Sequence, residues 1–160
     1  VKEGKEGGVL GIFYMAAFLI QRGESVNSTF AAAAAPASHE DAFFKMNAMG
    51  TLTVPNQPQR FFFHDVPEED VQTYIDELTA CTFLTSPLTN DVYGQVEAAY
   101  LLCESDRVLP LVYQQGMVAS AEKSGGKKFE VFRCKGGHEA FLSCESAVVD
   151  AVEKFVQRLG

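Results

Sequence analysis

The sequence predicts an α/β fold built on a parallel sheet. Three continuous apolar runs, at about residues 9–18, 98–103 and 129–134, have the length and composition of strands that are covered on both faces. Amphipathic helical patterns follow the second and third runs. Strands that alternate with helices pair in parallel through right-handed crossovers. With 160 residues, the chain fits a single domain.

A long segment of about residues 26–95 separates the first predicted strand from the second. Within it we expect a helix over 42–49, with Ser38 as a candidate N-cap, and a short strand over 51–54. Pro58 indicates a loop. Insertions of this length are usually functional lids, so we interpret the segment as a helical cap.

Helix boundaries are indicated by proline and serine residues. Pro67 opens a helix at its first position, followed by three acidic residues in the first turn. Pro110 opens another helix, and Ser143 or Ser146 begins the last one. The faces that we expect these two helices to turn toward the sheet consist of Val112, Met117, Val118 and Ala121, and of Val148, Val149, Val152, Phe155, Val156 and Leu159.

The charge balance argues against two classes of partner. A formal net charge of -8 argues against nucleic acid and against an anionic membrane, because both bind to a basic face. The apolar run from Gly8 to Ile20 is shorter than the roughly 20 residues of a membrane span. Glu3 and Glu6 interrupt the basic start that a signal peptide needs. We therefore expect neither nucleic acid nor membrane as a partner.

The cysteines predict a reducing compartment. The four, at positions 81, 103, 134 and 144, form no Cys-x-x-Cys pair, and two of them lie inside apolar strand patterns. Such thiols behave as small apolar side chains. We expect all four to be reduced and the protein to be cytoplasmic. A zinc site would need a tighter cluster with histidine, so no metal and no cofactor is implied.

One ionisable residue follows each of the last two strands. Asp106 comes after the second strand and His138 after the third. An aspartate and a histidine at the carboxyl ends of parallel strands are two members of a nucleophile–His–acid triad. His138 would act as a general base toward a hydroxyl, and Asp106 would fix the tautomer of the imidazole. The Gly-x-Ser-x-Gly pentapeptide that carries a serine nucleophile does not occur.

Taken singly, each of these residues has a simpler explanation. Asp106 could cap a turn, His138 could be a turn histidine, and Glu104 could replace Asp106 as the acid. His64 is better explained by packing in the cap, and His39 by solvation. Because Asp106 and His138 occur together, each after a strand, we favour the triad.

The two loops resemble those of a known family. Cys-Glu-Ser-Asp-Arg at 103–107, followed by Gly-Gly-His-x-x-Phe-Leu-Ser at 136–143, is similar to the α/β-hydrolase family, and more narrowly to its hydroxynitrile lyase and methylesterase group. The resemblance runs from about residue 9 to 155 and corresponds to the C-terminal half of that fold. It implies a triad acid at Asp106, a triad base at His138 and a cap over about 36–95.

The first five strands, the oxyanion loop and the nucleophile elbow of the family have no counterpart here. The chain begins with Val1 rather than methionine, so we expect residues 1–160 to be a partial α/β-hydrolase domain. The missing N-terminal half would then be supplied by another segment, or the chain would associate with itself through the open edge of its first strand.

These features predict acyl transfer on small esters or lactones, through a covalent acyl-enzyme that forms only once the nucleophile is supplied. Two alternatives stay open: a non-enzymatic remnant that binds an apolar ligand or a partner chain, and a hydroxynitrile-lyase-like activity. Aromatic residues could line a pocket for a small apolar substrate or simply pack together. The predicted substrate-binding residues are Phe18, Phe43, Phe44, Phe62 and Phe83.

Overall fold

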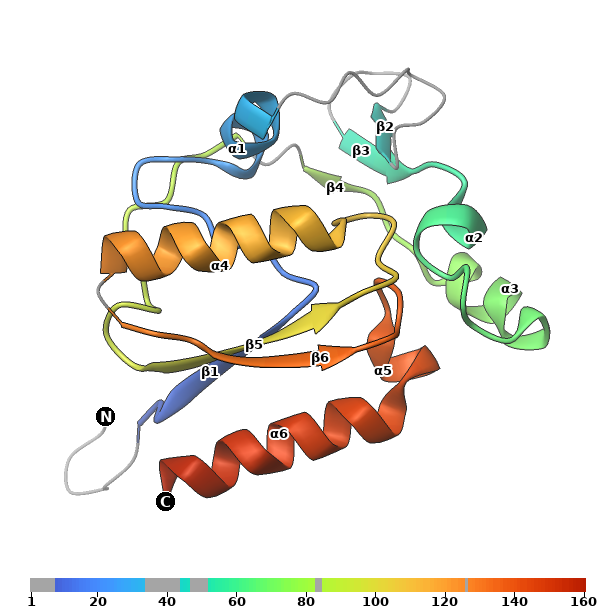
Figure 1. The fold of residues 1–160 in the computed structure, drawn as a ribbon. Helices are drawn as coiled ribbons and strands as arrows, with labels where there is room; N and C mark the ends of the chain where they lie inside the picture. The colour runs from blue at the N-terminus through green and yellow to red at the C-terminus, as the bar shows by residue number, and fades with distance from the viewer. Residues whose placement is uncertain (1–7, 34–43, 47–51, 83–84, 126) are drawn as a thin grey trace.

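The structure is a computed structural model that describes residues 8–33, 44–46, 52–82, 85–125 and 127–160. Strands β1 (Gly11–Met15), β5 (Glu97–Cys103) and β6 (Glu130–Cys134) form a parallel sheet in the order β1-β5-β6. Helix α4 (Leu111–Gly125) lies on one face of this sheet and helix α6 (Glu145–Leu159) on the other (Figure 1). The predicted α/β class with parallel strands and flanking helices is confirmed.

The first strand is shorter than the apolar run that predicted it. It ends at Met15, because Ala16 has a φ of 45° and an extended strand cannot continue through a left-handed residue. The Tyr100 hydroxyl then fixes the following backbone. It accepts a hydrogen bond from the N–H of Ala17 and donates one to the carbonyl of the same residue, at 3.1 and 2.6 Å.

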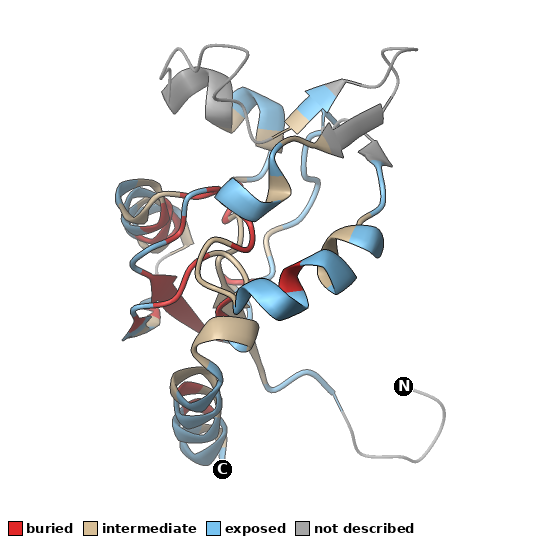
Figure 2. Cartoon of the chain, turned by 90° about the vertical axis from the view of Figure 1, so that its right-hand side faces the viewer, coloured by how far each residue is buried: buried red, intermediate tan, exposed pale blue. Residues whose placement is uncertain are grey.

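The sheet alternates its side chains between two apolar layers. Tyr100 and Leu102 pack with residues of α4, whereas Leu101 and Cys103 pack with residues of α6. This alternation follows from the two-residue period of a strand. Six of the seven residues of β5 are buried, so this strand forms the centre of the fold. Figure 2 shows buried residues in the central sheet and in the helices and loops that pack around it.

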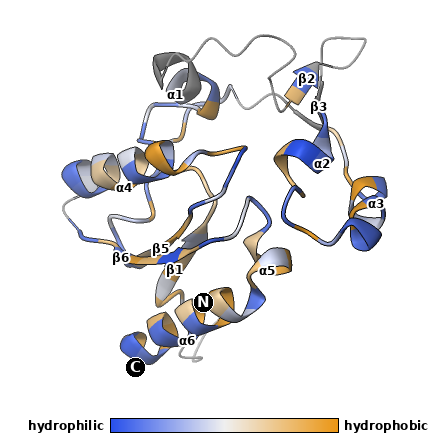
Figure 3. Ribbon diagram, turned by 45° about the vertical axis from the view of Figure 1, so that its right-hand side comes forward, coloured by the Kyte–Doolittle hydropathy of each residue, from blue (hydrophilic) through white to orange (hydrophobic). Residues whose placement is uncertain are grey.

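Two of the predicted helix faces are wrong in part. Val112 is 69% exposed, and Gln114 is buried in its place with Met117 and Val118. Successive helical residues are rotated by about 100°, so a residue two positions before a buried one lies on a different face. The same rotation separates the exposed Val149 from the buried Ala151. Figure 3 shows the resulting mixture of hydrophilic and hydrophobic positions along α6.

The segment between β1 and β5, called the inserted segment below, contains both helices and strands. Its helices are α1 (Val26–Ala33), α2 (Pro58–Phe61) and α3 (Glu68–Asp76). Strands β2 (Phe44–Met46), β3 (Leu52–Pro55) and β4 (Cys81–Thr82) form a small antiparallel sheet.

Several local predictions for this segment can be compared with the structure. The helix predicted over 42–49 is wrong where the chain is described, because residues 44–46 pair with β3 as a strand. The predicted short strand corresponds to β3. Pro58 begins α2 rather than a loop, and Pro67 is the N-cap of α3 rather than its first residue. Ser38 lies outside the described residues.

The inserted segment contacts the sheet domain, which is the parallel sheet with α4 and α6, in two places. One is where the chain enters and leaves the segment, and the other is the segment's apolar core. Gly23 donates its N–H to the Leu88 carbonyl, and Leu88 donates its N–H to Glu24, both at 2.8 Å. Gly23 adopts a φ of 88°, which favours glycine. The apolar core of the segment includes Val108, which belongs to the loop after β5. Its other buried members are Phe61, Phe62, Phe63 and Val71. None of the described helices combines the length and the apolar character needed to span a membrane.

We predict that Gly11→Ala destabilises the packing of β1 against α6. A Cβ at Gly11 would lie 2.8 Å from the Phe155 ring and 3.1 Å from the backbone oxygen of Glu97. Overpacking of this kind lowers the free energy of unfolding by about 1–3 kcal/mol. The control is Gly116→Ala in α4, where a Cβ meets nothing within 4 Å and helix propensity should raise stability by about 0.8–1 kcal/mol. Urea unfolding measures both, and equal effects of the two substitutions would contradict the packing described here.

Candidate active site

The loops that follow β5 and β6 bring Asp106 and His138 together. The two strands are neighbours in parallel register, with Cys103 opposite Cys134, so both loops leave the same edge of the sheet. Two backbone hydrogen bonds join them, from Glu104 to the Cys134 carbonyl and from Ser105 to the Gly136 carbonyl, at 3.0 and 3.1 Å. The positions of Asp106 and His138 are therefore linked through the backbone as well as through their side chains.

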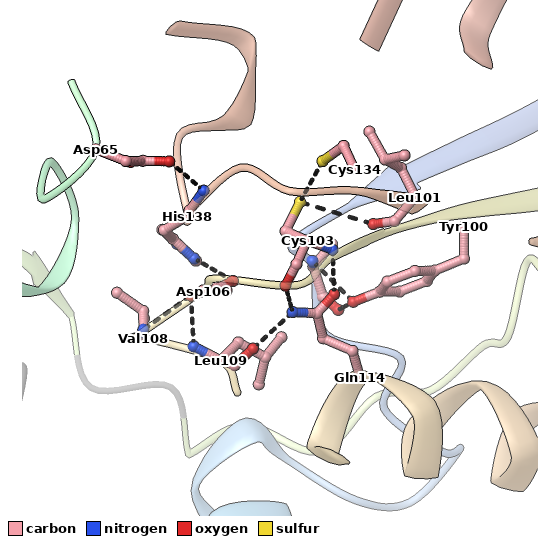
Figure 4. A network of polar contacts seen from close by, with 12 residues as sticks. Asp65, Tyr100, Leu101, Cys103, Asp106, Val108, Leu109, Gln114, Cys134 and His138 are labelled. Atoms are coloured by element: carbon pink, nitrogen blue, oxygen red, sulfur yellow. Dashed lines mark hydrogen bonds and ion pairs between the residues drawn. The ribbon is translucent and has the colours of Figure 1, made fainter. Parts of the chain in front are cut away.

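A hydrogen bond of 3.0 Å joins His138 Nδ1 and Asp106 Oδ2 (Figure 4). The side chain of Asp106 is fully buried, and that of His138 is 19% exposed. The second carboxylate oxygen, Oδ1, accepts the N–H groups of Val108 and Leu109, both at 2.8 Å. A buried carboxylate is costly unless it is paired and hydrogen-bonded. These three contacts fulfil that requirement and fix the direction in which Oδ2 faces the imidazole.

The inserted segment contacts the His138 loop directly. The Phe62 ring meets the imidazole edge-on, with 5.4 Å between ring centroids. The Asp65 carboxylate accepts the N–H of Gly137, the residue before the histidine. A Cβ at Gly137 would lie 2.6 Å from Asp65 Oδ1, so only glycine permits this approach. Sequence analysis missed Asp65. The Gly136-Gly137 pair is the signal that could have indicated a close neighbour.

The predicted aromatic residues lie in different places. Phe62 lies against His138, and Phe44 packs on Phe62 with 5.7 Å between centroids. Phe18 instead packs against the apolar layer between the sheet and α4. Phe43 and Phe83 lie outside the described residues. The structure thus brings two of the five predicted substrate-binding residues to the histidine or its aromatic neighbour.

The alternative acid is directed elsewhere. Glu104 forms an ion pair with Arg133 at 3.0 Å, and both side chains are partly exposed. Asp106, and not Glu104, holds the imidazole. The ring of His64 lies near Gly137, with Nδ1 buried and without a hydrogen-bond partner. His39 lies outside the described residues.

Three thiols near the site are free of disulfides; those of Cys103 and Cys134 are buried, and that of Cys144 is partly exposed. Cys103, Cys134 and Cys144 are free, and the sulfurs of Cys103 and Cys134 lie 3.8 Å apart. The hydrogen bond to Cys134 and burial raise the pKa of the Cys103 thiol, so it packs as a neutral, small apolar group. The described part of the chain contains no cluster of three or more histidine, cysteine or acidic residues that could hold a metal ion.

Comparisons with known proteins agree on the fold. No family model matches the chain. The α/β hydrolase nvfD of Aspergillus novofumigatus is 26% identical over 149 residues, which are 90% of this chain and 56% of that protein. Among solved structures, polyneuridine aldehyde esterase superposes with a TM-score of 0.72 at 17% identity, over 92% of this chain and 62% of its own. The chain has the α/β-hydrolase fold.

Two further α/β-hydrolase structures are similar. The pyrethroid hydrolase PytH gives a TM-score of 0.69 at 17% identity, over 93% of this chain and 61% of its own. The methylesterase MES16 from Arabidopsis gives 0.67 at 15% identity, over 93% and 59%. The predicted resemblance to the α/β-hydrolases is thereby confirmed at the level of the fold. The chain spans little more than half the length of the curated relative that it matches.

We predict that Gly137→Ala separates the inserted segment from the His138 loop. The new methyl group would lie 2.6 Å from both Asp65 Oδ1 and His64 Cε1, so these side chains would have to move away. The free energy of unfolding should fall by about 1–3 kcal/mol, and the backbone NMR signals of residues 64–66 should shift. Gly94→Ala is the control, because its Cβ would meet only Asp91 at 3.7 Å. Unchanged signals at 64–66 in Gly137→Ala would show that the contact is absent in solution.

We also predict that Glu139 contributes to the free energy of unfolding in a way that depends on pH. Burial raises the pKa of this carboxyl above its ordinary value of 4.5; the charge on His138 opposes the shift and that on Asp106 adds to it. The folded state then holds the proton more tightly than the unfolded state. The stability that Glu139 contributes is therefore present at low pH and is lost as the pH rises from about 4.5 through the folded-state pKa.

Glu139→Gln should accordingly stabilise the protein at pH 7 and have little effect at pH 4, as measured by urea unfolding at both pH values. The exposed Glu153, in α6, provides the matched control as Glu153→Gln. If Glu139→Gln had the same effect at both pH values, the cause assigned here would be incorrect.

Proposed function

We propose that this chain supplies the acid and the base of an acyl-transfer site that hydrolyses small apolar esters or lactones. The observation that supports the proposal is the 3.0 Å hydrogen bond between the imidazole of His138 and the fully buried Asp106, on loops that leave the same sheet edge. The names of the similar structures add support, because they describe an esterase, a methylesterase and a hydrolase.

In the proposed mechanism, Asp106 accepts a hydrogen bond from the protonated Nδ1 and so fixes the tautomer in which Nε2 has a free lone pair. Nε2 takes the proton of a nucleophilic hydroxyl as its oxygen bonds to the ester carbonyl carbon. The resulting imidazolium returns that proton to the leaving alcohol as the C–O bond breaks. Water then repeats the sequence on the acyl-enzyme and releases the acid. The buried carboxylate stabilises the imidazolium in both steps. No metal and no cofactor takes part in this proposal.

The nucleophile is proposed to come from a segment beyond the residues described. Among the described residues, no hydroxyl or thiol forms a hydrogen bond with the His138 ring. A serine on a strand-to-helix turn would meet this need, together with oxyanion donors from the same segment. The open edge of β1 is the proposed attachment point, since β1 pairs with β5 along one edge and no described strand pairs with the other.

We further propose that the inserted segment acts as a cap over the site, with Phe44 and Phe62 facing an apolar substrate. The edge-on contact of Phe62 with the His138 ring and the packing of Phe44 on Phe62 support this placement. A cytoplasmic location is also proposed, on the basis of the free thiols at Cys103, Cys134 and Cys144.

The direct test is hydrolysis of a p-nitrophenyl ester by the chain, with and without a second segment that carries a serine on a strand-to-helix turn. We expect turnover only when the segment is present. His138→Ala should abolish it, and Asp106→Asn should lower kcat by about 10⁴-fold, because the wrong tautomer is then held. The matched control is Asp150→Asn, an exposed aspartate in α6, which should retain full activity.

Labelling by a fluorophosphonate probe identifies the nucleophile in the same samples. Labelling of the added segment, and not of this chain, is expected. Turnover that survives His138→Ala would refute the proposed role of the imidazole. Absence of turnover in every combination would favour the alternative, a remnant that binds an apolar ligand or a partner chain.

A further inference from the structure

Gln114 is a polar residue in an apolar environment. It lies in α4 with an exposed fraction of 0%, among the largest fully buried side chains of the described protein. Its neighbours on the same helix face are apolar, namely Met117, Val118 and Ala121. A buried amide costs free energy unless its hydrogen bonds are made. The partners of Gln114 therefore indicate what the residue does.

The amide of Gln114 holds the two ends of the loop that carries Asp106. Its oxygen accepts the N–H of Cys103 at 2.9 Å, and its nitrogen donates to the carbonyl of the same residue at 3.0 Å. The nitrogen also donates to the carbonyl of Leu109 at 2.7 Å. Cys103 is the last residue of β5, and Leu109 lies at the far end of the loop (Figure 4). One side chain thus joins the start of the loop to its end.

The same loop end also determines where the carboxylate lies. Both backbone groups of Leu109 form hydrogen bonds. Its N–H donates to the carboxylate of Asp106, and its carbonyl accepts a hydrogen bond from the amide nitrogen of Gln114. The N–H of Leu109, with that of Val108, orients Oδ1 of Asp106, and this orientation directs Oδ2 to the imidazole. We infer that Gln114 is a positioning residue, which sets the Asp106–His138 hydrogen bond by closing the acid loop.

Glutamine is the residue type that meets this requirement. The contacts need one acceptor and two donors on a single planar group, placed at the length of a glutamine side chain. Glutamate lacks the donors and would face two carbonyl oxygens with a negative charge. Methionine has a similar length but forms none of the three bonds. Asparagine is one methylene shorter. The role is therefore specific to the amide and does not follow from filling volume alone.

The catalytic consequence of this inference rests on the proposed function, but the geometry can be tested without turnover. The experiment uses the ¹⁵N-labelled chain of 160 residues and follows the Nδ1 proton of His138 by NMR. A proton held between imidazole and carboxylate resonates far downfield of the backbone amides. The variants are Gln114→Met and, as the matched control, Gln115→Met, which alters the exposed neighbour in the same helix.

We expect the downfield signal to be lost in Gln114→Met and retained in Gln115→Met, while the amide signals of β6 and α6 stay dispersed in both. A folded Gln114→Met protein that keeps the signal unchanged would overturn the inference. If Gln114→Met does not fold, amide exchange in the wild-type protein decides. The amide protons of Cys103, Val108 and Leu109 should then exchange at rates within about tenfold of one another, because the hydrogen bonds of Gln114 keep both ends of the loop closed together. Exchange of Val108 and Leu109 on the order of 100-fold faster than Cys103 would overturn the inference.

Steady-state kinetics distinguish a positioning residue from a merely structural one, because only the former should change kcat without changing KM. In the active assembly, Gln114→Met should lower kcat by at least about 10-fold with KM within about 2-fold, because Asp106 acts on the transition state rather than on substrate binding. An equal rise in KM with unchanged kcat would contradict positioning. Wild-type protein that shows the downfield signal but no turnover would refute the proposed function and leave this geometry intact.

Discussion

The burial of one carboxylate constrains the rest of this structure. Asp106 has no exposed side-chain surface, so all of its hydrogen bonds must come from the protein. Two backbone N–H groups and one imidazole provide them. Each of these partners requires a particular loop conformation, and the loop is closed in turn by the amide of Gln114. The geometry between Asp106 and His138 is thus set by a connected network of hydrogen bonds, and not by a single contact.

The inserted segment contributes to this site from the other side. Val108, whose N–H binds Asp106, is also a buried member of the aromatic core of that segment. Phe62 from the same core meets the His138 ring edge-on, and the Asp65 carboxylate accepts the N–H of Gly137. The acid loop and the His138 loop therefore each contact both the sheet with its flanking helices and the inserted segment. A shift of the segment would therefore disturb both ionisable groups together, which is the physical basis for treating it as part of the site.

The features that the sequence predicts correctly depend on local periodicity. Continuous apolar runs identified all three parallel strands, and the position of Asp106 and His138 after adjacent strands indicated that they would meet. The features that it missed depend on distant contacts. Asp65 and Gly137 are 72 positions apart, and the pairing of β2 with β3 overrides the local pattern that suggested a helix. Gln114 was missed for a different reason, since a glutamine in an amphipathic helix is ordinarily exposed.

The first strand connects the fold to the proposed function. Every residue of β1 is only half-buried, whereas its neighbour β5 is buried along six of its seven residues. Yet β1 has the continuous apolar sequence of a strand covered on both faces and flanked on both edges. A further parallel strand added at its open edge would resolve this mismatch. The carboxyl end of such a strand would reach the sheet edge that carries Asp106 and His138, because parallel strands end at a common edge. A nucleophile on the turn after a strand of this extended sheet would therefore be placed on the same side as the base that is proposed to activate it.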